Sequence, residues 1–175
     1  MSDNNQCFEN APMSLVIIEN IFLLAMFISG TIGLLPFKLN GIPILSILYA
    51  LFAIIMIVFV LRKHICTSCY YYDKWCHVGW GKLAAKLFKK DSGNRELGFK
   101  LIWPTWIVLM FLPVLLILVA IALYPAQKNF SLAVLGIFII TLIINNGLHF
   151  YDCKKCKMQE TCPGNPGRKN NNRQT

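Results

Sequence analysis

Four long runs of apolar residues, separated by short polar segments, dominate the pattern of this chain. They cover residues 13–37, 42–61, 101–124 and 130–148. A helix rises about 1.5 Å per residue, so roughly 20 apolar residues cross the hydrocarbon core of a bilayer. Pro and Gly interrupt the pattern between the first and second runs, and a short polar segment follows the third. The pattern therefore predicts four transmembrane helices arranged as two hairpins, an all-α integral membrane protein.

The polar segments divide the chain into six parts. The predicted parts are a polar leader (1–12), transmembrane hairpin 1 (13–61), a Cys-rich loop (62–100), transmembrane hairpin 2 (101–149), a Cys-rich segment (150–162) and a disordered basic tail (163–175). Inside the loop, apolar residues and lysines between Trp80 and Lys90 recur at helical spacing. This spacing predicts an amphipathic helix, either in the membrane interface or packed over the bundle.

Composition and charge agree with a membrane protein and suggest its orientation. The chain is 56% hydrophobic and 14% charged. Of its 17 Lys and Arg residues, nine lie in 62–100 and six follow residue 150, against Lys38 and Lys128 in the two opposite turns. Basic residues favour the cytoplasmic side of a membrane. We therefore expect a multi-pass protein of the cell membrane, with both termini and both Cys-rich parts in the cytosol.

The strongest chemical signal is a pair of matched cysteine triplets. The first triplet has the spacing C-x2-C-x6-C and the second C-x2-C-x5-C, each just after a hairpin. Stable disulfides are rare in the cytosol, where C-x2-C pairs more often bind metal or carry out redox chemistry. The candidate metal ligands are therefore Cys66, Cys69, Cys76, Cys153, Cys156 and Cys162.

Three ligand arrangements compete. One zinc site can take its four thiolates from the two C-x2-C pairs, Cys66 with Cys69 and Cys153 with Cys156. Each triplet can instead recruit a histidine as an extra ligand, the candidates being His64, His77 and His149. The thiolates can also hold an iron–sulfur cluster, because the sequence Cys162-Pro163 is similar to the cysteine-proline ending of bacterial ferredoxin motifs. Thiolate ligation suits zinc and iron–sulfur clusters alike, so the sequence leaves the cofactor undecided.

The cofactor determines the function that we expect. Zinc implies a structural or partner-docking role, whereas an iron–sulfur cluster implies electron transfer with a cytoplasmic or membrane redox partner, or with quinone. The alternative is a membrane thiol–disulfide oxidoreductase that uses a CxxC pair, which leaves open whether the chain is an enzyme. It resembles four-helix oxidoreductases of that class in size and helix number. Their working cysteines usually face the oxidising side of the membrane, whereas the cysteines of this chain are predicted to face the cytosol. The lipid bilayer is the expected partner, homo-oligomers remain open, and no aromatic-basic platform favours nucleic acid.

Polar residues inside the apolar runs form the last signal. Glu19 and Asn20 lie near the start of the first run, and Asn145, Asn146 and His149 lie near the end of the fourth. Because the two helices run in opposite directions, these groups should share one depth. A carboxylate in the membrane needs polar partners. We expect an interhelical clamp between Glu19 and one of the asparagines, or a proton or quinone site coupled to the cysteines.

Overall fold

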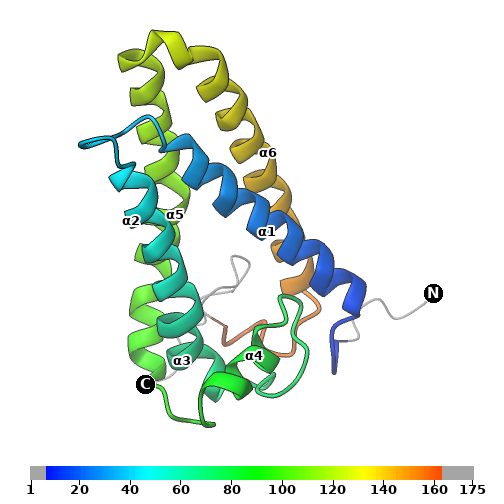
Figure 1. The fold of residues 1–175 in the computed structure, drawn as a ribbon. Helices are drawn as coiled ribbons and strands as arrows, with labels where there is room; N and C mark the ends of the chain where they lie inside the picture. The colour runs from blue at the N-terminus through cyan, green and yellow to red at the C-terminus, as the bar shows by residue number, and fades with distance from the viewer. Residues whose placement is uncertain (1–6, 163–175) are drawn as a thin grey trace, which may run out of the picture.

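The computed structural model describes residues 7–162, which form a helical bundle (Figure 1). Its three uninterrupted long helices are α1, Met13–Gly33, α5, Arg95–Leu123, and α6, Lys128–Cys153. The 3-10 turn η3, Pro125–Gln127, connects α5 to α6. The structure thus confirms an all-helical fold, and four of its helical segments are long and apolar enough to cross a membrane.

The second of these segments, Ile44–Ser68, changes its helix type along its length. It begins as α2, Ile44–Ile54, and widens into the π-helix η1, Ile55–Leu61. It then continues as α3, Arg62–Ile65, and ends in the 3-10 turn η2, Cys66–Ser68. A π-helical turn rotates the side chains that follow it relative to a continuous α-helix, and such turns are frequent near functional sites. This one immediately precedes Arg62 and Cys66.

Large apolar side chains cover the outside of the bundle. Phe111 on α5 and Ile143 on α6 are 68% and 65% exposed. A soluble monomer rarely exposes so much contiguous apolar surface, whereas hydrocarbon is its natural solvent in a membrane. The four segments therefore suggest a multi-pass membrane protein in contact with a lipid bilayer.

The interior of the bundle depends on close contact between α1 and α6. These two helices pack against each other more extensively than either does against its neighbour in sequence (Figure 1). Met26 on α1 and Phe138 on α6 are fully buried in this interface. Gly30 belongs to the same contact, since a Cβ atom there would lie only 3.1 Å from the Phe138 ring. Small residues permit such close helix packing in membranes.

Hydrogen bonds between helices tie α2 into the bundle. Ser46 donates to the carbonyl of Thr31 on α1 at 2.7 Å. The hydroxyl of Tyr49 donates to the carbonyl of Leu109 on α5 at 3.0 Å. Interhelical bonds of this kind contribute about 0.6 kcal/mol each on average.

One end of the bundle gathers three chain segments, and we call it the cysteine end: residues 7–12, 66–94 and 150–162. The short helix α4, Trp80–Leu87, lies in the second segment. Backbone hydrogen bonds join the segments, from Phe8 N–H to the Lys155 carbonyl at 2.9 Å and from Ala11 N–H to the Trp75 carbonyl at 2.8 Å. Both cysteine triplets therefore lie at the same end of the molecule.

Candidate metal centres at the cysteine end

The six triplet cysteines come from the ends of two long helical segments and from the turns that follow them. Cys66 begins the turn η2, and Cys153 is the last residue of α6. Their thiols are close enough to interact electrostatically across the triplets. Charge on Cys66 would act on three other thiols, those of Cys69, Cys76 and Cys162. The two triplets therefore form one thiol cluster rather than two distant ones.

Backbone N–H groups point at three of these sulfurs. Cys69 and Cys156 each accept a hydrogen bond from the N–H group two residues later in the chain, and four N–H groups face Cys76, those of Gly81, Trp80, Val78 and Gly79. At Cys156 the nitrogen lies 3.4 Å from the sulfur. The donors to Cys69 and Cys156 are the N–H groups of Tyr71 and Met158. Hydrogen bonds of this kind stabilise a thiolate over a thiol, which is the form that binds metal.

Burial acts in the opposite direction on the same thiols. It raises the pKa of Cys69 to about 11, and it also raises the pKa of Cys76 and of Cys156. Without a cation, these groups therefore stay protonated at neutral pH. A bound cation would favour the thiolate, so binding would release protons.

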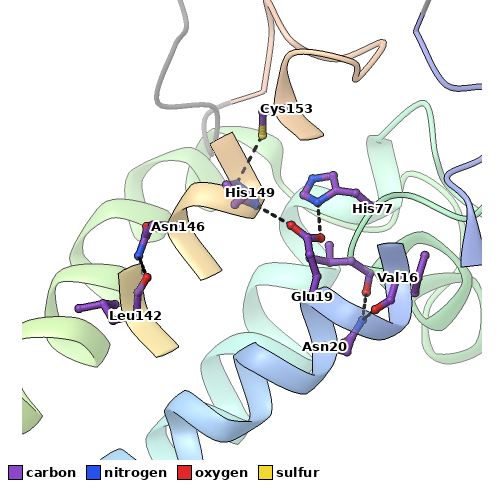
Figure 2. A network of polar contacts seen from close by, with 9 residues as sticks. Val16, Glu19, Asn20, His77, Leu142, Asn146, His149 and Cys153 are labelled. Atoms are coloured by element: carbon purple, nitrogen blue, oxygen red, sulfur yellow. Dashed lines mark hydrogen bonds and ion pairs between the residues drawn. The ribbon is translucent and has the colours of Figure 1, made fainter. Parts of the chain in front are cut away.

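A second cluster of polar groups lies beside the thiols, between α1 and α6 (Figure 2). Its centre is Glu19, whose side chain is only 1% exposed. One carboxylate oxygen lies 2.6 Å from Nδ1 of His77, and the other lies 4.0 Å from Nδ1 of His149. The two imidazole rings approach each other with their centroids 4.8 Å apart.

The last turn of α6 contributes three of the side chains in this cluster. His149, Asp152 and Cys153 are separated by three and four residues, so they project from one face of the helix. Nε2 of His149 lies 3.5 Å from the Cys153 sulfur. Asp152 is 1% exposed, and neither of its carboxylate oxygens has a hydrogen-bond partner among the described residues.

The loop that carries Cys76 and His77 is fixed to α1. The side-chain amide of Asn20 donates to the Val78 carbonyl at 3.0 Å. Gly79 has a φ of +70° and approaches Val16 so closely that a Cβ atom would lie 2.9 Å from its Cγ1. A glycine is required here because other residues rarely adopt this φ and the space is filled. These contacts place His77 against Glu19.

Two groups of three ligand-type side chains are close enough together to hold a metal ion. Within each group all ligand atoms lie within 4.8 Å of one another. The groups are Glu19, His77 and Asp152, and His77, His149 and Cys153. In residues 7–162, each such group thus contains at most one cysteine.

An apolar cavity of about 490 Å³ lies between α1 and the second helical segment. Apolar side chains make up most of its lining, and Arg62 and Trp80 add polar atoms to it. The Arg62 guanidinium lies over the Trp80 ring, 5.1 Å from its centroid. Arg62 Nε, Arg62 Nη1 and Trp80 Nε1 are buried without a hydrogen-bond partner in the described part of the chain. Arg62 also interacts electrostatically with Cys66 and Cys76.

The other polar residues named from the sequence have different roles. Nδ1 of His64 accepts a hydrogen bond from the Asn94 N–H at 2.9 Å, next to the start of α5. Asn146 donates to the Leu142 carbonyl at 2.8 Å within its own helix. The clamp expected between Glu19 and Asn145 or Asn146 is therefore wrong: one Glu19 oxygen bonds to His77, and the other has no hydrogen-bond partner among the described residues. Asn145 is buried on α6, one turn before His149.

Sequence reasoning missed Asp152 and Arg62. Asp152 falls just after the fourth apolar run, where a polar residue needs no special explanation. The available signal was its spacing from His149 and Cys153 on a helix that continues past the apolar run. From the sequence, Arg62 is one of the basic residues that suggest the orientation in the membrane. The structure buries it directly after the π-helix.

No protein-family model, curated protein or solved structure matches the chain.

Proposed function

We propose that this protein is an electron-transfer protein of the membrane, with an iron–sulfur cluster bound at its cysteine end. The proposed cluster ligands are Cys66, Cys69, Cys76 and Cys162. The observation that carries the proposal is that these four thiols lie close enough to interact electrostatically. They comprise the first triplet and the last cysteine of the second. Four cysteine thiolates are the usual ligands of such a cluster.

In residues 7–162, no three cysteine sulfurs lie within 4.8 Å of one another, and this favours a cluster over a single zinc ion. Tetrahedral zinc with bonds of about 2.3 Å needs its thiolate sulfurs about 3.8 Å apart. In residues 7–162, the ligand groups within 4.8 Å of one another include at most one cysteine each. A four-iron cluster holds its cysteine sulfurs farther apart, because each cysteine binds a different iron atom.

Two features around the thiols support a redox role. The N–H groups directed at Cys69 and Cys76 would stabilise the negative charge of a cluster, and hydrogen bonds to sulfur adjust reduction potentials. The buried Arg62 guanidinium adds a positive charge beside Cys66 and Cys76. Both features favour the reduced, more negative state.

The cavity beside Arg62 supports an electron partner that dissolves in the membrane. Its lining is mainly apolar and includes Arg62 and Trp80, whose buried donor atoms have no hydrogen-bond partner among the described residues. A quinone combines a hydrocarbon tail with carbonyl oxygens that accept hydrogen bonds, and so matches both parts of this surface. We place the cysteine end in the cytosol, following the distribution of basic residues.

The test is the content of iron and acid-labile sulfide in protein purified anaerobically in detergent, together with its visible absorption. We expect iron and sulfide in equal amounts and absorption that bleaches on reduction. Cys66→Ser and Cys162→Ser should each remove most of the iron. Cys7→Ser is the matched control, since Cys7 lies outside both triplets, and it should retain full iron.

Other results would replace the proposal with a named alternative. Zinc without iron or sulfide would indicate a structural or docking site. Neither metal, with one CxxC pair cycling between dithiol and disulfide, would indicate a thiol–disulfide oxidoreductase. Full iron in Cys162→Ser together with loss in Cys153→Ser would assign the fourth ligand differently and refute the ligand set.

A further inference from the structure

Two carboxylates, those of Glu19 and Asp152, are buried side by side at the cysteine end. Glu19 and Asp152 are each 1% exposed, and the charge of Glu19 acts on Asp152. Asp152 has no hydrogen-bond partner within the described segment, although both its oxygens are inaccessible to solvent. Buried carboxylates are normally paired, hydrogen-bonded or bound to a metal. A bound cation would satisfy both carboxylates.

The neighbouring side chains are those that a transition metal would use. His77 belongs to both groups of closely spaced ligands, once with Glu19 and Asp152 and once with His149 and Cys153. Imidazole nitrogen and carboxylate oxygen together suit zinc, whereas magnesium and calcium prefer oxygen alone.

We infer that Glu19, His77, His149 and Asp152 form a zinc site that is separate from the thiolate centre. Zinc takes four ligands at about 2.0–2.2 Å, which places neighbouring ligand atoms about 3.3 Å apart. Glu19 already lies 2.6 Å from His77 and 4.0 Å from His149, on opposite oxygens. Small side-chain rotations toward a central ion would satisfy this geometry.

Groups around the four ligands hold them in place. The His149 nitrogen that faces away from Glu19 lies 3.5 Å from the Cys153 sulfur, so this contact orients the imidazole (Figure 2). Such contacts to the second ring nitrogen are typical of metal-binding histidines. Cys153 therefore acts as a positioning residue here and is not needed among the four proposed cluster ligands.

The site would have a structural role and link separate segments of the chain. Its ligands come from α1, from the loop before α4 and from α6, so one ion would join three segments. Four protein ligands leave no open coordination position, which is typical of structural zinc. Bound zinc would hold the loop in the position that also presents Cys76.

The experiment measures zinc and iron together on the full chain in detergent. In a Cys66→Ser/Cys69→Ser background, which disrupts the thiolate centre, we expect one Zn²⁺ per chain by equilibrium dialysis. Asp152→Asn and Glu19→Gln should each weaken Zn²⁺ binding by at least about 100-fold, beyond the effect typical of indirect partners. Glu160→Gln is the control, since it removes the same charge from an exposed position at the same end. Co²⁺ in place of Zn²⁺ should give only weak sulfur-to-metal absorption.

The outcomes separate this site from the proposed cluster. Loss of zinc in Asp152→Asn with iron unchanged in an otherwise wild-type chain supports the site, and this measurement replaces the first if the double cysteine variant does not fold. Zinc retained at full affinity in both carboxylate variants overturns it. So does strong sulfur-to-cobalt absorption that Cys153→Ser abolishes, since sulfur would then be a ligand. Failure of the iron–sulfur measurement alone leaves these readouts unaffected.

Discussion

Gly79→Ala tests whether the backbone conformation before α4 controls metal binding. Gly79 has a φ of +70°, and the strain of a non-glycine residue in this region costs about 1–2 kcal/mol. The new Cβ would also lie 2.9 Å from Val16 Cγ1, closer than van der Waals contact allows. Since bound metal requires the native loop, this strain opposes binding. An energy of about 1–2 kcal/mol corresponds to a 5- to 30-fold weaker affinity.

The assay compares metal affinity and helix content of Gly79→Ala with those of Gly136→Ala. Gly136 lies in α6, and a Cβ atom added there would have no heavy atom within 4 Å, so alanine fits without contact. Alanine inside a helix is favoured over glycine by about 0.5–1 kcal/mol. We expect the control to bind metal normally and Gly79→Ala to keep its helices while binding more weakly. Equal affinity in both variants would refute the reasoning.

Two further predictions concern the bundle and are measured by unfolding in mixed micelles of increasing denaturing detergent. Tyr49→Phe removes the donor to the Leu109 carbonyl and should lower the free energy of unfolding by about 0.6 kcal/mol, and by no more than about 1.7; an unchanged midpoint would show that this bond adds nothing. Phe138→Ala should cost about 3 kcal/mol, the lower end of the soluble-core range, since lipid is as apolar as the protein interior. Ile143→Ala, at a position 65% exposed, is its control and should cost less than about 0.5 kcal/mol; similar losses in both would contradict the packing argument.

The sequence predicted those features that depend on the length and spacing of residue types. Four apolar runs were enough to predict four long helical segments, because crossing a bilayer demands about 20 apolar residues. Each triplet follows a hairpin directly. This position predicted that Cys66 and Cys153 would lie at the same end, since a short turn must bring each hairpin back.

The features that escaped prediction depend on which helix faces which. In lipid, both sides of a helix are apolar, so the pattern does not show that α1 packs mainly against α6. For the same reason the partners of Glu19 could not be predicted: asparagine and histidine on α6 lie at similar depths in the membrane. His77 came to Glu19 from a loop whose path depends on Gly79 and Asn20.

The π-helical turn Ile55–Leu61 sets the directions of the side chains that follow it, and so affects the cysteine end. Each residue of an α-helix turns the chain by about 100°. The same seven residues wound as an α-helix would swing Arg62 and Cys66 around the helix axis while changing no side chain that binds or contacts a ligand. The lipid-facing stretch of the second segment thus determines the orientation of the residues that follow it. Its helix type, as much as its hydrophobicity, sets where the first thiol points.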